Sequence, residues 1–232
     1  MAADRTLIDA VRHGLAAAAD PSRAPAMQAY MKSALPFYGV PAPAARKVFG
    51  AVLRAHPLAD RATWEDTVRA LWAEATHREE LYAALALAGD RLYRGHQDPA
   101  VLPLYEHLVV TGAWWDVVDD LAVHKVGPIL LTHPGPTRPV VLGWSRAEDL
   151  WLRRTSIICQ LMAKDRTDPD LLAACIEPSL DDRDFFLRKA IGWALRQHAR
   201  VDPDWVRAFV DAHADRLSTL SRREALKHLG AA

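Results

Sequence analysis

Apolar residues recur at steps of three and four along almost the whole chain, which is the period of an amphipathic helix. The segments that show this pattern best are LIDAVRHGLAAAA, ARKVFGAVLRAH, WEDTVRALWAEA, ELYAALALAGDRLY and DWVRAFVDAHADRL. β-Branched runs such as HLVV are short and lie inside helical patterns, so we predict no strand. The chain is therefore expected to be all-α, with about 12 to 14 helices joined by short connections.

Prolines separate the helical segments and mark their connections. In Asp98-Pro99 and Asp202-Pro203 an acid precedes the proline, which suits a helix whose first turn is capped by the acid. No low-complexity linker or break in composition interrupts the chain. We therefore expect residues 1–232 to form a single domain.

The C-terminal half repeats itself at an interval of 35 residues. The segment WLRRTSI at 151–157 aligns with FLRKAIG at 186–192, and SRREAL at 221–226 is a weaker third copy. A period of this size in a helical chain indicates stacked pairs of helices, each of which covers its neighbour. Each copy is predicted to begin the second helix of a pair.

Four side chains follow this period. Asp119 and Arg154 lie 35 residues apart, and Trp193 follows Arg154 by 39 residues, which is one period plus a helical turn. Trp115 precedes Asp119 by one turn, so the two share a helix face, whereas Trp114 points about 100° away and can anchor the core. A carboxylate in the core needs a cation or several donors, so the simplest arrangement places Trp115 and Asp119 on the solvent side.

The Asp119–Arg154 spacing supports two interpretations equally: an ion pair between neighbouring repeats, or a functional site. In a functional site, indole faces attract cations and a carboxylate stabilises developing positive charge. Arg154 would repel a cation, so it suits an anion such as phosphate. A cationic base on an anionic backbone satisfies all four residues, and an N-alkylated purine nucleotide in DNA has this character.

Composition narrows the class of protein. The 29 basic and 29 acidic residues cancel, which lowers the expectation of a nucleic-acid binder without excluding a basic face. The N-terminal segment has no apolar signal core, and no stretch approaches about 20 apolar residues, so we expect a soluble protein of a reducing compartment. Metal-ligand spacings, phosphate loops and nucleophile elbows are absent from the sequence, so each of the scattered histidines is interpreted as a surface or a satisfied core residue.

Several polar side chains are candidates for contacts with a phosphate backbone. Two of them precede a proline-flanked loop that opens a helix near Pro43, where free N–H groups form a ready phosphate site. Taken singly, each cation is more often a solvated charge. The candidates are Tyr30, Lys32, Arg46, Arg188, Arg196, Arg222 and Lys227.

Seven segments, in order from about residue 25 to 229, resemble the AlkD-type DNA alkylation repair proteins, a family of HEAT-like-repeat DNA glycosylases. They are YMKSALPFYGV, LWAEATHREELYAALAL, VTGAWWDVVD, the HP of LLTHP, WLRRTSIICQL, FFLRKAIGWALRQHA and LSRREALKHL. The combination of WWDxVD with KAIGWxLR makes the resemblance specific. The chain departs from the family at Pro41-Ala42, where a polar residue able to touch DNA is expected.

The resemblance implies an all-α solenoid of HEAT-like repeats whose concave face binds duplex DNA. The implied activity is hydrolytic removal of positively charged alkylpurines, notably 3-methyladenine and 7-methylguanine, without a cofactor and without drawing the base into a deep pocket. Carried over by motif, Asp119 is the catalytic carboxylate, Trp115 and Trp193 line the sugar–phosphate of the lesion, and Arg154 lies in the same cleft. Arg196 supports backbone binding. We expect a cytoplasmic monomer that acts on the bacterial nucleoid, with no lysine placed to cut the strand.

A protein of another class fits the same fold. A HEAT-like module that binds DNA or protein without catalysis is equally compatible with stacked helices, because solenoids are general binding scaffolds. Asp119 separates the two interpretations, since a carboxylate that faces DNA repels phosphate and brings no advantage to a pure binding module.

Overall fold

The computed structural model describes residues 2–229, which contain fourteen α-helices, several short turns of other helix types and no strand. The predicted all-α fold of packed helix pairs is thereby confirmed. The chain forms two compact units, Met1–His96 (unit 1) and Gln97–Ala232 (unit 2), each with its own core. Organisation as one domain stays a prediction. Within residues 2–229, no helix is both long enough and apolar enough to cross a membrane.

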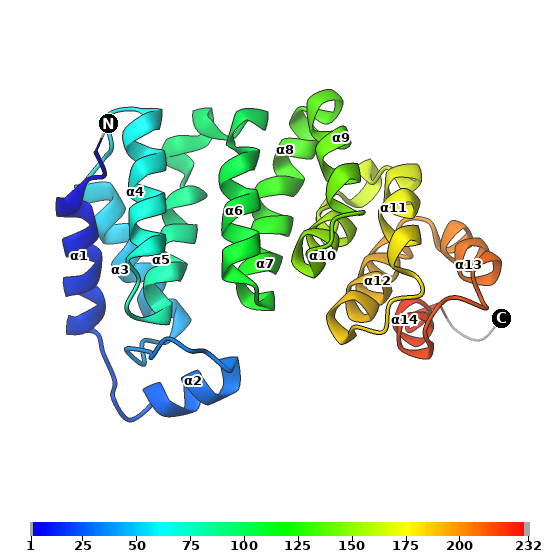
Figure 1. The fold of residues 1–232 in the computed structure, drawn as a ribbon, viewed down its shortest axis with the longest axis horizontal. Helices are drawn as coiled ribbons and strands as arrows, with labels where there is room; N and C mark the ends of the chain where they lie inside the picture. The colour runs from blue at the N-terminus through cyan, green and yellow to red at the C-terminus, as the bar shows by residue number, and fades with distance from the viewer. Residues whose placement is uncertain (1, 230–232) are drawn as a thin grey trace. The chain divides into compact units, whose positions relative to one another are not determined.

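In unit 1, helices α1, α3, α4 and α5 pack side by side, and α2 lies below them in Figure 1. Helix α4 packs on α5, and α1 packs on α3. The Trp64 indole lies at the centre of this core, fully buried, and its Nε1 donates to the Leu87 carbonyl at 3.1 Å. The elements of unit 1 are α1 (Arg5–Ala17), α2 (Ala24–Met31), α3 (Ala42–Ala55), α4 (Arg61–Ala73), α5 (Arg78–Ala88) and the 3₁₀ turn η1 (Arg91–His96).

The loop between α2 and α3 is fastened by two buried acids on α5. Glu79 accepts hydrogen bonds from three successive backbone N–H groups, at residues 38, 39 and 40. Glu80 accepts from the Tyr38 hydroxyl at 3.0 Å, and burial together with this bond raises the pKa of Tyr38 to about 12. Gly39 has φ +84°, and a Cβ there would meet the Asp20 carbonyl at 2.0 Å, so this turn requires glycine.

Unit 2 continues the pairing of helices. Helix α7 packs on α6 and α10, and α11 packs on α9 and α10. Its elements are η2 (Pro99–Val101), α6 (Leu102–Gly112), α7 (Trp115–Leu121), the π turn η3 (Ala122–Val126), α8 (Gly127–Thr132), α9 (Pro134–Trp144), α10 (Leu150–Ile158), η4 (Lys164–Arg166), α11 (Pro169–Ile176), η5 (Glu177–Ser179), α12 (Phe185–His198), α13 (Pro203–Ala212) and α14 (Thr219–Ala225).

The 35-residue repeat corresponds to three helices that pack in succession. Each copy begins a helix, as predicted: α10, α12 and α14. Asp149 and Asp184, themselves 35 residues apart, cap the first two by accepting from the backbone N–H groups that follow them. Helix α10 packs on α12, and α12 packs closely on α14. A Cβ at Gly192 would meet Glu224 Cβ at 2.6 Å, so the glycine of the IGW motif allows this close approach.

The caps expected before the prolines are also confirmed. Asp98 accepts from the Ala100 N–H at 2.9 Å and opens η2. Asp202 accepts from the Trp205 N–H at 2.9 Å and opens α13. In both cases proline occupies the first helical position, where its missing N–H removes no helical hydrogen bond.

Candidate active site

A bidentate ion pair joins α7 to α10 at the predicted 35-residue spacing. Arg154 Nε donates to Asp119 Oδ1 at 2.7 Å, and Nη2 donates to Asp119 Oδ2 at 2.8 Å. Its Nη1 donates to the Phe186 carbonyl at 2.6 Å. The Arg154 side chain is only 4% exposed, whereas the Asp119 side chain is 18% exposed. The cation therefore lies beneath the acid, and the acid forms the accessible end of the pair.

Arg154 was predicted to bind phosphate, but in the structure it binds Asp119 and the Phe186 carbonyl instead. Three of its N–H groups are bound within the protein and its side chain is buried, so the guanidinium has no open face for an anion. The pair joins neighbouring repeats, as the first interpretation of the spacing predicted. Its acid borders a groove, and the functional interpretation stays a prediction. Asp119 and Trp115 are half-buried rather than fully on the solvent side.

An aromatic cluster supports the ion pair from one side. Trp114 packs against Trp151 and Phe186, with ring centroids 6.1 and 5.3 Å away, and the latter two rings lie 5.0 Å apart. Trp151 and Phe186 occupy equivalent positions 35 residues apart in the repeat. Of the adjacent tryptophans, Trp114 thus joins the packed cluster, while Trp115 is the first residue of α7. The cluster keeps the Phe186 carbonyl in place beside Arg154.

Asp119 borders a groove of about 340 Å³ within unit 2. One wall comes from α7 and the π turn η3, and the other from α12 and the turns after α10. The groove combines two carboxylates with an indole, aliphatic side chains and an amide, which suits a ligand with positive charge and an apolar face. Its lining residues are Asp119, Asp120, Val123, His124, Leu161, Met162, Trp193 and Gln197.

The structure thus brings Asp119, Arg154 and Trp193 together, as the period predicted. Trp193 and Gln197 lie one turn apart on α12 and reach the groove from the same helix face. Trp115 lies one turn before Asp119 on α7 but is not among the groove-lining residues. Its contact with the sugar–phosphate of a lesion stays a prediction.

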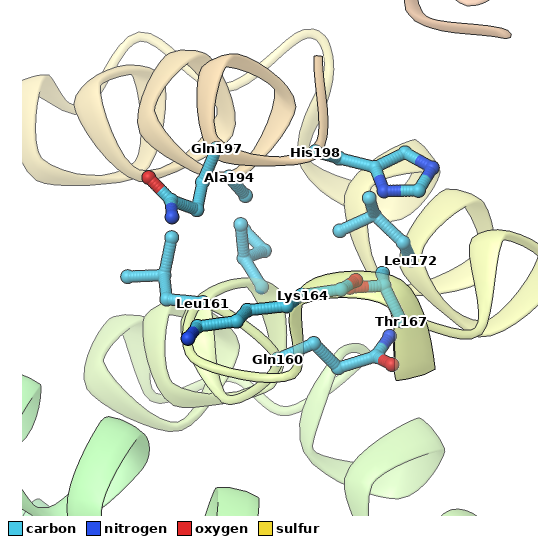
Figure 2. A pocket seen from close by; sticks show the side chains of 9 residues that line it. Gln160, Leu161, Lys164, Thr167, Leu172, Ala194, Gln197 and His198 are labelled. Carbon is cyan, nitrogen blue, oxygen red and sulfur yellow. The ribbon is translucent and has the colours of Figure 1, made fainter. Parts of the chain in front are cut away.

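A small cavity lies next to the groove and shares Leu161 and Gln197 with it. Figure 2 shows Ala194, Gln197 and His198 on one helix, facing Gln160 and Lys164 across this space. Its volume of about 10 Å³ has room for roughly one water molecule, so it cannot hold a nucleotide. Both ring nitrogens of the buried His198 lack a hydrogen-bond partner, and burial lowers the pKa of this side chain.

A second charged cluster joins α12 to α14. Lys189 Nζ lies 3.0 Å from Glu224 Oε1, and Arg196 pairs with the other oxygen of the same carboxylate. The hydrogen bond from Lys189 lowers the pKa of Glu224, although burial opposes this shift. Arg196, a predicted backbone contact, is therefore tied to an acid. Of the other predicted contacts in unit 2, Arg222 and Lys227 are exposed, and Arg188 is half-buried with its Nε bonded to the Asp184 carbonyl at 3.3 Å.

The predicted contacts of unit 1 are all accessible. Tyr30 is one of the most exposed large side chains of the protein, and Lys32 ends α2 in a left-handed conformation with φ 50°. Arg46 lines a shallow groove of about 470 Å³ on α3, together with Pro43, Lys47, Gly50 and Arg54. No side chain caps the start of α3 at Pro41, but Pro43 has no N–H group, and the N–H groups of Ala44 and Ala45 donate to the Pro41 carbonyl at 2.9 Å. The predicted set of free N–H groups is therefore reduced at this helix start.

Sequence reasoning missed several residues of the site. Asp120, His124, Met162 and Gln197 line the groove without having been predicted. Glu224 could have been found, because it lies one period beyond Lys189 just as Arg154 lies one period beyond Asp119. Met162 lies in a turn outside the repeat, so no periodic signal marks it.

Comparison with known proteins identifies the family. A family model described as DNA alkylation repair enzyme matches residues 11–229. A solved structure titled as a predicted DNA alkylation repair enzyme from Enterococcus faecalis is similar, with a TM-score of 0.81 and 31% identity over 92% of this chain and 98% of that one. No curated protein matches the chain. The chain belongs to the DNA alkylation repair enzyme family, which assigns it a role in the repair of alkylated DNA.

Proposed function

We propose that this protein is a monofunctional DNA glycosylase that hydrolyses the N-glycosidic bond of positively charged N3- and N7-alkylated purines in duplex DNA. In this way it would begin base excision repair at 3-methyladenine and 7-methylguanine. The observation that carries the proposal is the Asp119 carboxylate, which a buried arginine holds at the edge of a groove shared with Trp193. Membership of the family supplies the wider role in alkylation repair.

The proposed reaction uses a carboxylate to stabilise a cation. Alkylation leaves positive charge on the purine, so the electron pair of the glycosidic bond departs with the base and neutralises it. The deoxyribose then carries the charge as an oxocarbenium-like species, which a fixed carboxylate stabilises. Asp119 also orients a water, whose oxygen bonds to C1′ while its proton passes to solvent, so that an abasic site and a free neutral alkylpurine result. In this scheme Asp119 faces the sugar, while Arg154 is a positioning residue that fixes both oxygens of Asp119.

The remaining walls of the groove suit the same substrate. Trp193, and Trp115 one turn before Asp119, offer indole faces to the charged nucleotide. The exposed side chains of His124 and Met162 border the groove, so a base can be contacted at the surface without a deep pocket. No lysine is among the lining residues of this groove in the described chain, so we expect no Schiff base with C1′ and no strand cleavage.

Contacts with the phosphate backbone would come from both units. We assign them to Tyr30, Lys32, Arg46, Arg188, Arg196, Arg222 and Lys227. Because the net charge is zero, binding should be modest and should weaken steeply with salt. The protein would act as a one-domain cytoplasmic monomer that requires no cofactor.

The test is release of free base from methylated duplex DNA, followed by chromatography, with the wild type and Asp119→Asn side by side. We expect release of 7-methylguanine and 3-methyladenine by the wild type, and a loss of at least about 100-fold in the variant, as for removal of a preorganised electrostatic group. The variant should bind undamaged duplex at least as well, because a negative charge near DNA is gone.

A matched control is Asp181→Asn. Asp181 also pairs with an arginine 35 residues away, Arg216, at 2.6 Å, but the pair is exposed and does not line the groove. This variant should retain base release. A wild type that binds DNA yet releases no base would overturn the proposal in favour of a non-catalytic binding module.

A further inference from the structure

The groove beside Asp119 has two chemically different walls. The wall from α7 and the π turn η3 carries two carboxylates, Asp119 and Asp120. The π turn buries Lys125 beside Asp120, whose Oδ2 accepts from the lysine Nζ at 2.8 Å, so this acid also presents its negative end. The other wall, from α12 and the turns after α10, carries Trp193 and Gln197 and has no acid among its lining residues in the described part of the chain. Because like charges repel, we expect a nucleotide whose sugar meets Asp119 to place its phosphate against α12.

The cation that was expected to hold phosphate in this groove is not free to do so. Arg154 is buried, and its N–H groups donate to Asp119 and to the Phe186 carbonyl. Ionised carboxylates accept hydrogen bonds and donate none. A phosphate in this groove therefore needs another donor, and that donor should lie on the wall without acids.

Gln197 has an amide that can serve as this donor. It lies one turn after Trp193 on α12, so both side chains reach the groove from the same helix face. Its neighbours in the chain are engaged elsewhere, because Arg196 pairs with Glu224 and His198 is buried. Figure 2 shows the Gln197 amide and the His198 ring directed apart. Within residues 2–229, no hydrogen bond holds the half-buried Gln197 side chain.

We infer that Gln197 binds the damaged nucleotide by donating from Nε2 to an oxygen of a phosphate that flanks it, an inference that rests on the proposed glycosylase function. An amide has two N–H donors and no charge, so it binds phosphate without offsetting the field of the nearby carboxylates. A cation at this position would weaken that field, which stabilises the positively charged sugar. Gln197 thus holds the backbone while Asp119 faces the sugar.

Two other potential donors line the groove and fit this role less well. His124 lies on the wall with the carboxylates, and it is exposed with no contact within residues 2–229 that holds its ring. Trp193 has a single N–H group at the edge of its indole. An indole whose face covers the nucleotide points this edge away from the atoms beneath the face. Gln197 combines a free donor with a position on the wall without acids.

The test is a cycle that combines a substitution in the protein with one in the DNA. Single-turnover base release by the wild type and Gln197→Ala is measured on a 7-methylguanine duplex, and on duplexes whose phosphate on the 5′ or the 3′ side of the lesion is a neutral methylphosphonate. On the natural duplex we expect Gln197→Ala to lower the rate constant at subsaturating protein by roughly 10-fold, as for a hydrogen bond to a charged group. On one of the two methylphosphonate duplexes the loss should be less than about 2-fold, because the partner is already gone.

Two further variants separate this contact from a packing role. Gln197→Glu keeps the length of the side chain and replaces the donor with a negative charge, so it should lose more than Gln197→Ala on the natural duplex and should lose less of that excess on the neutral linkage. Gln160→Ala is the matched control. The Gln160 amide lines the small cavity and not the groove, donates to the Asp168 carbonyl at 3.1 Å and accepts from the Asp168 N–H at 2.8 Å. This variant should lower Tm, and any loss of rate should be equal on all the duplexes.

The outcomes distinguish this contact from the proposed function. Equal losses for Gln197→Ala on the natural duplex and on both methylphosphonate duplexes would show that the amide contacts neither phosphate, and would overturn this inference alone. Absence of base release by the wild type on the natural duplex would overturn the proposed function, and the inference with it.

Discussion

Two ion pairs in unit 2 occupy the same position of the 35-residue repeat with opposite polarity. Asp119, Arg154, Lys189 and Glu224 follow one another at intervals of 35 residues. In the first pair the arginine side chain is 4% exposed and the acid 18%. In the second pair the lysine side chain is 39% exposed and the acid 11%. The first pair therefore presents its negative member, and the second its positive member.

Equivalent positions of the same repeat can therefore present opposite charges to solvent. Stacked helices bring equivalent positions into contact whatever residues they hold, so the repeat dictates proximity and not sign. Which charge is accessible to a ligand depends on which member of the pair is more deeply buried. At Asp119 the accessible charge is negative and borders a groove with an indole, which suits a cationic sugar and base. At Lys189 it is positive, which suits phosphate, and Glu224 is additionally shared with Arg196.

The largest expected difference between the pairs comes from removing each cation. Arg154→Met leaves Asp119 half-buried without its cation, and we expect a loss of about 3 kcal/mol in the free energy of unfolding. Base release should fall at least about 100-fold, because Asp119 is no longer fixed. Lys189→Met removes an exposed charge while Glu224 keeps Arg196, so its cost should stay below about 1 kcal/mol and release should persist.

Urea unfolding and single-turnover base release measure both variants. Equal losses of stability in Arg154→Met and Lys189→Met would show that depth does not distinguish the pairs. An Arg154→Met protein with full activity would remove Arg154 from the positioning role assigned to it.

A smaller effect, on the affinity for DNA, is expected from removing the exposed cation Arg222 of α14. Arg222→Ala should weaken binding to duplex DNA by a few-fold, equally for damaged and undamaged sequences, and should reduce the slope of log affinity against log salt by about one. Arg216→Ala is the control, because Asp181 already neutralises that arginine. Fluorescence anisotropy over a range of salt concentrations provides both numbers. An unchanged slope in Arg222→Ala would take this residue out of the phosphate-binding set.

The smallest effect is on the pH dependence of stability, and it concerns His198 in the small cavity next to the groove. Burial lowers its pKa, with Asp202 partly opposing the shift, so the folded state resists a proton that the unfolded chain takes up near pH 6.5. Stability contributed by the neutral ring is present above that pH and is lost as pH falls through the lowered pKa. His198→Phe should therefore show a shallower decline in unfolding free energy between about pH 7 and about pH 5. An identical decline in both proteins would mean that other groups control this range.

Several contacts of the candidate site could be predicted from the spacing of residues along the sequence. The 35-residue period predicted the contact of Asp119 with Arg154 and the nearness of Trp193, because packed helices place equivalent turns side by side. The same 35-residue spacing relates Lys189 to Glu224, and this ion pair was not predicted. The caps at Asp98 and Asp202 were predictable because capping is a local interaction of a few residues.

Other features depend on depth and on a local change of helix type, which periodicity does not encode. Arg154 was expected to hold phosphate, but Phe186 and the aromatic cluster bury it. Asp120 gained its partner only through the π turn, since ordinary helical spacing points to residue 124 rather than to Lys125.

The sequence by itself determined the all-α fold, the stacking of helices, the family and the acid–cation pairing, since each depends on spacing and residue type along the chain. Only the tertiary structure decided which member of each pair faces outward, because exposure is set by how many neighbouring side chains cover a position. The groove beside Asp119 likewise comes from three separate segments of the chain whose side chains leave a space between them. Their contact is a property of packing, and no single segment contains it.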